Sequence, residues 1–312
     1  MLSNSLQIII LMKAQNNNLL GAVLILIAVL ALTLKDGADK YLILHGYHPV
    51  EMVFFRFTIP FLCMLIFMPK QTKIAILATN NKLVLRSTLF LVCAITSVIA
   101  LKYIPLNVYI IITQMGSIAF MLGGALFFNE RLTPTKIVAT ILGFIGVIVV
   151  MNPTGEEGLH VVYLLPLIIV LANTAYNLLT KTIDARVSFI SIFINTFFIL
   201  GIAATICLVV DPQMWRTPSV ESIPYFMIIP IVTIVSQLCL IKAMKVADAS
   251  HVAPFFYFQI LFACVIGYWL FDEIPTRYSL IGSVFIMSAG LLITFMNYRK
   301  NGVKKELSYK LK

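Results

Sequence analysis

Charged residues are scarce in this sequence of 312 residues, because Asp, Glu, Lys and Arg together make up only 12% of it. A typical soluble domain contains about 25%. Hydrophobic residues make up 60% of the chain, and the mean hydropathy is +0.98. A soluble fold of this length has too little interior to hide so much apolar surface. The composition therefore excludes an ordinary soluble domain and predicts an integral membrane protein.

Several chemical motifs are also missing from the sequence. The five cysteines form no CxxC pair and all fall in apolar segments, so no disulfide framework or zinc site is predicted. No GxxxxGK[ST], HExxH or GxSxG motif occurs, so nothing indicates ATP hydrolysis or metalloprotease chemistry. The net charge of +10 lies in loops and at the C-terminal end, which argues against nucleic acid as a partner. We expect no enzyme, no cofactor and no metal site.

Long uncharged runs show how the chain crosses the membrane. Residues 108–128 contain no charged residue over 21 positions, and as a helix they are about 31 Å long, enough to span the hydrocarbon core. Strands of a membrane barrel would alternate apolar and polar residues instead. The predicted fold is therefore all-α, with ten transmembrane helices. The predicted spans are 19–44, 49–69, 83–102, 106–128, 133–151, 161–180, 187–210, 223–242, 250–271 and 277–297.

The distribution of basic residues predicts the orientation. If the N-terminus is cytoplasmic, 17 of the 23 Lys and Arg residues lie on the cytoplasmic side, three on the outer side and three inside spans. Such a bias places both termini inside the cell and requires an even number of spans. Residues 1–18 are expected to be a cytoplasmic extension, disordered or lying on the surface. Residues 298–312 are expected to be a basic cytoplasmic tail.

The two halves of the chain resemble each other. A shift of 143 residues lays Ala100–Thr133 over Ala243–Thr276, with six identities in 34 positions, and each copy ends in Phe-polar-Glu. This predicts two five-helix repeats, residues 19–152 and 161–297. Because five is odd, the second repeat is inverted, an arrangement typical of secondary transporters. The alternatives are a duplicated protein that transports nothing and a membrane-embedded enzyme, for which no clustered nucleophile or acid–base set is found.

Charged residues are concentrated at the end of the first span. The apolar run Leu19–Leu34 is about 24 Å long as a helix, too short for about 30 Å of hydrocarbon, so the helix must continue through the charges that follow. Asp36 and Lys40 are four residues apart, as are Lys35 and Asp39, so both pairs can bond along the helix. We predict that Asp36 and Lys40 bind substrate and that Lys35 and Asp39 act in gating. The alternative is a cluster of charges at the outer interface.

Three more charged residues are candidates. Arg56 either braces the bundle, by pairing with Glu51 or with a carboxylate of the first span, or grips a substrate carboxylate with two bonds. Glu130 and Glu273 each end a span beside the start of the next helix, where a carboxylate favours the helix N-terminus. We expect both of these to be structural.

Uncharged polar residues recur at helical spacing in the later spans. Asn173 and Asn177 share one helix face, and Gln114 and Tyr257 occupy matching positions in the two repeats. We expect these four to bind substrate. The alternative is that they join helices, a contribution of about 0.6 kcal/mol for each hydrogen bond.

The start of the ninth span combines a titratable group with a helix breaker. His251 is a candidate coupling residue, because imidazole titrates near neutral pH. Pro254 removes one backbone bond and frees a carbonyl that can line a cavity or form a hinge. Both are predicted to act in gating or coupling.

Several loose motifs appear in a fixed order along the chain. They are PVEMVFFRF at 49–57, NERL at 129–132, GFIG at 143–146, Ala253-Pro254 with Tyr257, GYWLFDE at 267–273, and Gly282 with Gly290. With these residues the chain resembles the drug/metabolite transporter superfamily, specifically its EamA-type members, over about residues 19–297. The resemblance implies ten helices in two inverted halves and a central cavity lined by spans 1, 3, 4, 6, 8 and 9.

Within that family, the segments 35–42, 54–57 and 240–254 are similar to those of bacterial S-adenosylmethionine uptake carriers. This implies the bacterial inner membrane as the location and a small-molecule substrate, with S-adenosylmethionine or an amino-acid-like zwitterion as the lead. The expected partners are the substrate, membrane lipid, and protons or a counter-substrate. The alternative is an exporter of amino acids or of other metabolites.

Overall fold

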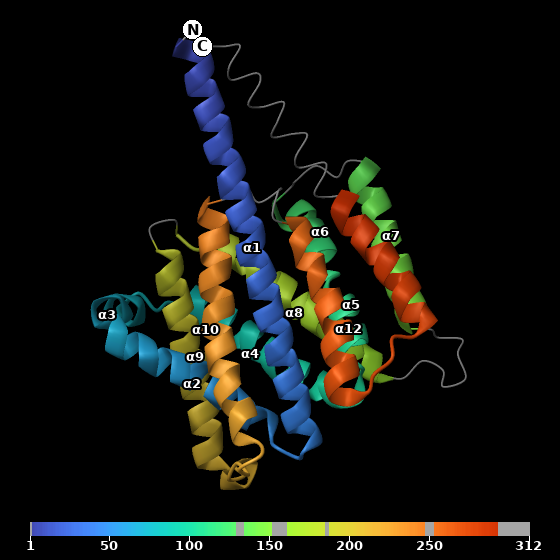
Figure 1. Cartoon of the computed structure of the whole chain (residues 1–312). Coiled ribbons are helices and arrows are strands. Elements are labelled where there is room, and N and C mark those ends of the chain that lie inside the picture. Colours follow the sequence, from blue (N-terminus) through green and yellow to red (C-terminus); the bar gives the residue numbers. More distant parts are fainter. Residues whose placement is uncertain (1, 129–133, 152–160, 185–186, 247–252, 293–312) are drawn as a thin grey trace.

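Helices make up all the regular structure in the described part of the chain. The computed structural model describes residues 2–128, 134–151, 161–184, 187–246 and 253–292 (Figure 1). Seven helices are long and apolar enough to cross a membrane, and three shorter apolar helices accompany them. A multi-pass membrane protein is therefore confirmed, while the count of ten crossings stays a prediction. The shorter apolar helices are Ile137–Met151, Phe255–Phe271 and Arg277–Leu292.

The helices follow the predicted spans closely, with one addition, the short helix α3, in a segment predicted to be a connection. In chain order they are α1 (Leu2–Leu44), α2 (Pro49–Phe67), α3 (Pro69–Leu77), α4 (Asn81–Tyr103), α5 (Leu106–Thr113), α6 (Gly116–Phe128), α7 (Pro134–Met151), η1 (Val161–Tyr163), α8 (Leu164–Lys181), α9 (Phe189–Val210), η2 (Pro212–Met214), α10 (Ile223–Val246), η3 (Ala253–Tyr257) and α12 (Phe258–Phe271). The last described helix is Arg277–Leu292.

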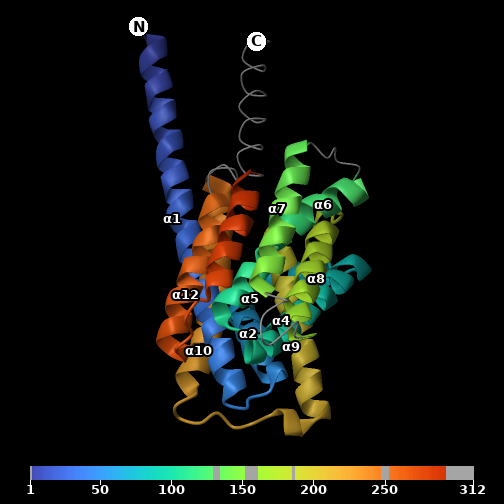
Figure 2. The same cartoon turned by 90° about the vertical axis from the view of Figure 1, so that its right-hand side faces the viewer.

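The first helix is longer than expected. α1 is one continuous helix from Leu2, so residues 2–18 are helical rather than disordered. No proline interrupts residues 2–44, and the polar run 15–18 does not break the helix. Figures 1 and 2 show the N-terminal part of α1 projecting beyond the bundle. The charged segment 35–40 lies inside the same helix, as the length of the apolar run predicted.

Two predicted spans are broken at matching positions. The span 106–128 divides into α5, which ends at Thr113, and α6, which begins at Gly116. The span that follows residue 250 begins with the 3₁₀ turn η3, and its α-helix starts at Phe258. Gln114 and Tyr257, which are 143 residues apart, stand at these two breaks. The repeat found in the sequence is therefore also a repeat of helix interruptions.

Helices of the first half pack chiefly against helices of the second. α1 packs along α10, α4 along α8 and α2 along α9. α1 also contacts α12, while α8 contacts α6. In each repeat the first helix thus packs against the third and fourth helices of the other repeat. Exchanging the two halves leaves this set of pairings unchanged, which is the relation expected of two interlocked repeats.

The fifth helices of the two halves cross at glycines. A Cβ atom on Gly282 of the last helix would lie 2.6 Å from the carbonyl oxygen of Gly146 in α7. A Cβ on Gly146 would lie 2.9 Å from the carbonyl oxygen of Gly282. Small residues allow such close helix crossings in membranes, where packing rather than the hydrophobic effect holds helices together. Both glycines belong to the motifs noted in the sequence.

The end of the bundle opposite the start of α1 is covered by the connection between α9 and α10. The Arg216 guanidinium in this connection donates a hydrogen bond to the carbonyl oxygen of His45, at 2.9 Å. The backbone N–H of Ser219 donates to the Tyr47 hydroxyl, at 2.8 Å. These two hydrogen bonds therefore hold the connection from α1 to α2 against the one from α9 to α10.

Candidate functional site

Four charged side chains project from the C-terminal third of α1 and are largely buried. Asp36 and Lys40 are each 4% exposed and Asp39 is 0% exposed. The Lys35 ammonium lies 2.6 Å from Asp36 Oδ1 and 3.7 Å from Asp39 Oδ2. The predicted pairing of Lys35 with Asp39 is therefore present, although Lys35 lies closer to its immediate neighbour. These charges lie inside the bundle rather than at its surface.

Arg56 of α2 pairs with Asp39 of α1. Its guanidinium donates to Asp39 Oδ2, and the residue is 4% exposed. Of the two bracing partners considered for Arg56, the structure selects the carboxylate of the first span. Glu51 instead accepts the backbone N–H groups of His48 and Arg216, at 3.2 and 3.1 Å. Arg56 thus joins α2 to the charged segment of α1.

Lys40 does not pair with Asp36, although the two are four residues apart. Its ammonium donates to Glu273, beyond the C-terminal end of α12, and to the carbonyl oxygen of Ile104, at 2.9 Å. The long side chain of Lys40 reaches these acceptors on neighbouring elements. Asp36 is left with Lys35 as its nearest cation. The expectation of an intrahelical pair between Asp36 and Lys40 is therefore wrong.

Glu273 caps a helix, but not the one that follows it in the chain. Its Oε2 accepts the backbone N–H of Leu106, the first residue of α5, at 2.8 Å. That N–H has no partner within its own helix, and a carboxylate there also favours the helix dipole. Glu273 therefore joins α5 of the first half to α1 through Lys40. The matching residue Glu130 lies outside the described residues.

The six charges form a balanced cluster of two ion-paired groups, with Lys35 and Arg56 against Asp36 and Asp39, and Lys40 against Glu273. Burying an ionisable group in a membrane protein costs several kcal/mol unless it is paired or faces water, and this balance limits that penalty. Some hydrogen-bonding capacity is left over. Among the described residues, Asp39 Oδ1 and Arg56 Nε have no hydrogen-bond partner. The cluster can therefore accept further polar groups.

A pocket of about 520 Å³ lies against the Lys40–Glu273 ion pair. It is formed by the end of α1, the connection from α4 to α5, and the end of α12. Its remaining lining includes both charged and aromatic side chains. The lining residues are Lys40, Tyr41, Leu44, His45, Lys102, Tyr103, Ile104, Pro105, Leu270, Phe271, Asp272 and Glu273. We call it the outer pocket, after the orientation predicted from the basic residues.

A second group of predicted residues meets at the two helix breaks. Gln114 Nε2 donates to the carbonyl oxygen of Phe256 in η3, at 3.0 Å, and lies 3.4 Å from Gln259 Oε1. The Tyr257 hydroxyl lies against Gly290, where a Cβ would be only 1.2 Å away. Gln114 and Tyr257 therefore lie in one region, as their matching positions suggested.

The two residues proposed for gating or coupling near the second break are only partly described. Pro254 lies in η3, the 3₁₀ turn that precedes α12. His251 lies outside the described residues. The break itself supports a special role for the backbone in this segment, because irregular backbone at membrane depth is tolerated only where it is buried in protein or lines a cavity.

Asn173 and Asn177 bond to each other along α8. Asn177 Nδ2 donates to the carbonyl oxygen of Asn173, at 2.8 Å, and to its Oδ1, at 2.9 Å. No hydrogen bond in the described part of the chain joins these side chains to the charges of α1. The structure therefore places the predicted substrate-binding residues in three groups rather than one.

Arg86 of α4 is a buried cation. It is one of the 17 basic residues that were placed on the cytoplasmic side when the orientation was predicted. It is 2% exposed and donates to the Thr180 hydroxyl at 2.8 Å, to the Thr196 hydroxyl at 2.6 Å and to the Tyr176 hydroxyl. Its guanidinium carbon lies 4.0 Å from the centre of the Tyr176 ring. Arg86 thus joins α4 to α8 and α9. Its position inside the predicted span 83–102 was the signal that could have identified it.

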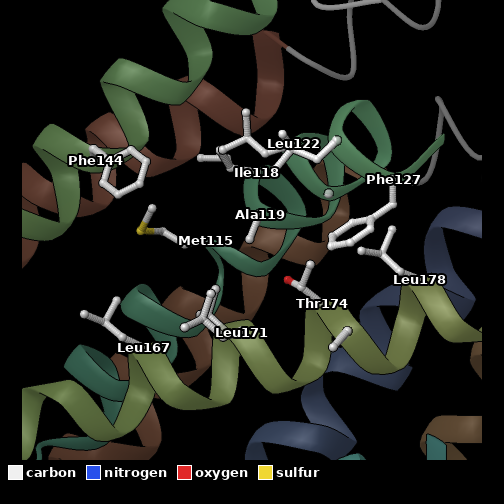
Figure 3. Close-up of a pocket in the computed structure, with 14 residues that line it drawn as sticks. Met115, Ile118, Ala119, Leu122, Phe127, Phe144, Leu167, Leu171, Thr174 and Leu178 are labelled. Carbon is white, nitrogen blue, oxygen red and sulfur yellow. The ribbon is translucent and has the colours of Figure 1, made fainter. Parts of the chain in front are cut away.

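A second hollow, between α6, α7 and α8, has a different lining. Its volume is about 480 Å³, and Figure 3 shows it enclosed by side chains such as Met115, Phe144 and Leu171. Thr174 supplies the one hydroxyl among the lining side chains. Phe127 and Leu171 are 75% and 68% exposed, so the cavity borders the outside of the bundle. We call it the apolar cavity.

Comparison with known proteins identifies relatives of the whole chain. The model of the EamA-like transporter family matches residues 19–152 and 160–295. The S-adenosylmethionine uptake transporter of Rickettsia prowazekii is 24% identical over 283 residues, which cover 90% of this chain and 94% of the relative. The riboflavin transporter of Rhizobium johnstonii is 25% identical over 278 residues, covering 88% and 90%.

One solved structure supports the fold independently of close sequence similarity. A crystal structure aligns with a TM-score of 0.62 over 91% of this chain and 98% of its own, at 14% identity. At that identity, the likeness shows the arrangement of helices alone.

Proposed function

The chain belongs to the EamA-like transporter family, and we propose that it is a secondary carrier for a small zwitterionic metabolite. Membership makes it a membrane transporter of small metabolites rather than an enzyme. The relatives named above carry chemically different substrates, so the substrate must be argued from the site. The observation that carries the proposal is the balanced, buried cluster of three cations and three anions on α1, α2 and the residues after α12.

A zwitterion fits this cluster better than a molecule with a single charge. Its carboxylate can meet Lys40 or Arg56, and its ammonium can meet Asp36 or Glu273, so the net charge of the site does not change. Unsatisfied atoms on Asp39 and Arg56 add hydrogen-bonding capacity for such groups. A buried site that kept a net charge would be costly in a membrane.

S-adenosylmethionine is our leading substrate. Its ammonium and carboxylate form the zwitterion that matches the cluster, and its sulfonium adds one positive charge outside this pairing. The relative in Rickettsia prowazekii is an S-adenosylmethionine uptake transporter. Aromatic side chains such as Phe255, Phe256 and Tyr257 are suited to stacking on adenine or on the sulfonium. Gln114, Asn173 and Asn177 would supply neutral hydrogen bonds.

The proposed topology has ten crossings in two inverted halves, with both termini in the cytoplasm of a bacterial cell. The outer pocket would then open away from the cytoplasm. Substrate would pass between the halves by alternating access, and the helix breaks at Gln114 and Tyr257 would mark the midplane site, where transporters use discontinuous helices. Protons or a counter-substrate would provide the coupling, with His251 as a candidate proton site.

Uptake into liposomes tests this proposal. Purified full-length protein should move labelled S-adenosylmethionine in a saturable manner, and unlabelled substrate preloaded inside should stimulate entry. Asp36→Asn should reduce transport at least about tenfold, because the buried cluster then has one net positive charge. Arg277→Met removes an exposed charge from the same end of the molecule and is the matched control.

Two failures have different meanings. If neither S-adenosylmethionine nor any amino acid enters, the substrate assignment is wrong. If no solute of any class is moved by correctly inserted protein, the carrier function itself is wrong. If substrate on the opposite side stimulates transport in only one direction, that direction distinguishes uptake from export.

A further inference from the structure

The ion pair between Lys40 and Glu273 closes the base of the outer pocket. Each partner also holds one side of the connection from α4 to α5. Lys40 donates to the carbonyl oxygen of Ile104, and Glu273 accepts the N–H of Leu106, on either side of Pro105. The pair thus ties α1, the connection from α4 to α5 and the end of α12 together at a single point.

Neither charge can be left alone at low cost. The Lys40 side chain is 5% exposed and the Glu273 side chain 18% exposed. Removing one partner of a buried ion pair is strongly destabilising, because the other charge stays buried without compensation. A ligand that carries only an anion could bind Lys40 but would strand Glu273. A ligand that carries only a cation would strand Lys40.

We infer that the Lys40–Glu273 pair is a substrate-specificity site that exchanges its ion pair for the ammonium and carboxylate of an α-amino acid group. The carboxylate of the ligand takes the Lys40 ammonium, and the ammonium of the ligand takes the Glu273 carboxylate. Both protein charges stay compensated throughout, and no bond other than hydrogen bonds changes. This inference rests on the proposed carrier function and gives Glu273, expected from the sequence to be structural, a direct part in binding.

The surroundings of the pair suit this exchange. The Lys40 ammonium lies 5.3 Å from the centre of the Phe271 ring, so an ammonium bound to Glu273 would also lie near an aromatic face, which attracts cations. The pocket volume of about 520 Å³ leaves room for the rest of the ligand beside Tyr41 and Tyr103. Exchange of the pair would also loosen the point that ties α1 to the end of α12. Binding at this site and opening of the outer end would therefore be coupled.

Matched ligands test the inference. The first triplet is S-adenosylmethionine, its decarboxylated form and its 2-oxo acid analogue, and the second is methionine, 3-(methylthio)propylamine and 4-(methylthio)butanoate. Binding is measured by thermal stabilisation of the full chain in detergent and by competition with uptake of the labelled zwitterion. In at least one triplet, we expect the zwitterion to bind at least about tenfold more tightly than either analogue, since stranding a buried charge exceeds 1.4 kcal/mol.

The double variant Lys40→Met/Glu273→Gln supplies the decisive comparison. It removes both charges together and leaves none unpaired, so it should fold where a single variant fails. Its preference for the zwitterion should fall below about threefold, because neither analogue now strands a buried charge. Arg277→Met should keep the preference of the native chain.

The possible outcomes separate this inference from the proposed function. Uptake of a zwitterion with no preference over the amine or the acid, or a preference retained by the double variant, overturns the exchange site and leaves the carrier function standing. Absence of both binding and uptake for all six ligands overturns the exchange site and the assignment of S-adenosylmethionine as substrate, while the carrier function is tested separately with solutes of other classes. A preference present in the native chain and lost in the double variant supports the inference.

Discussion

The outer pocket and the apolar cavity are nearly equal in volume, about 520 and 480 Å³, yet their linings have opposite chemistry. One rests on an ion pair that connects three elements, whereas the other is lined by aliphatic and aromatic side chains (Figure 3). In a membrane, an apolar hollow beside lipid is already solvated and needs no ligand. A buried charge always needs a partner. The comparison teaches that buried charge, rather than hollow size, points to the substrate site.

The largest expected effect breaks the charged side of this comparison. Arg56→Met would leave Asp39, which is 0% exposed, without its guanidinium partner. We expect a loss of about 3–5 kcal/mol in stability, measured as a lower melting temperature and a lower yield of folded protein in detergent. The double variant Arg56→Met/Asp39→Asn should recover most of this loss. A double variant as unstable as Arg56→Met would show that charge pairing is not what Arg56 supplies.

A smaller effect of opposite sign is expected on the apolar side. Thr174 is 9% exposed, and its hydroxyl has no hydrogen-bond partner among the described residues. Thr174→Val should stabilise the protein by about 1 kcal/mol, because a buried hydroxyl without a partner is destabilising. Melting temperature and uptake rate are the measurements, and uptake should not change. A loss of uptake would mean that the apolar cavity holds part of the substrate, which would reverse the comparison.

The smallest expected effect lies outside both hollows, in the connection between α1 and α2. The His48 imidazole accepts the backbone N–H of Val50 at 3.3 Å. Burial lowers the pKa of His48 below the usual 6.5, and the negative charge of Asp211 partly opposes this shift. Because the folded-state pKa is lower than the unfolded one, stability should fall as the pH drops below about 6.5. The melting temperature of His48→Asn should depend less on pH over this range. Identical pH profiles would contradict the assignment.

Much of the fold could be predicted because long uncharged runs require helices in lipid. The repeat motif indicated that these runs form two groups of five. The break at Gln114 was not predicted, since nothing in the apolar run 106–128 stops a helix. Its only signal was the match of Gln114 to Tyr257. The ends of the spans and the projecting start of α1 were predicted less well. The rules used for them are local in sequence and take no account of what packs against a helix.

The candidate site was predicted less completely, for a related reason. Local spacing assigned Lys40 to Asp36, four residues away, whereas its partner Glu273 lies 233 residues away in the chain. A long side chain can bond to any acceptor within its reach, and only the folded structure shows which acceptors these are. Arg86 was missed because its charge was counted toward orientation although its side chain is buried between helices. The residue types and the partners of Lys35 and Arg56 were predicted, but the partner of Lys40 was not.

The contact between Tyr257 and Gly290 constrains how this chain and its relatives can diverge. The Tyr257 hydroxyl occupies the space that any side chain at position 290 would need. The two positions should therefore covary in an alignment of related sequences, with glycine at 290 wherever 257 is tyrosine and larger residues at 290 only where 257 is small. A substitution at either position alone would be selected against, whereas a paired change would pass. Natural variation at this contact thus gives a record, independent of any purified protein, of whether the second helix break keeps its geometry across the family.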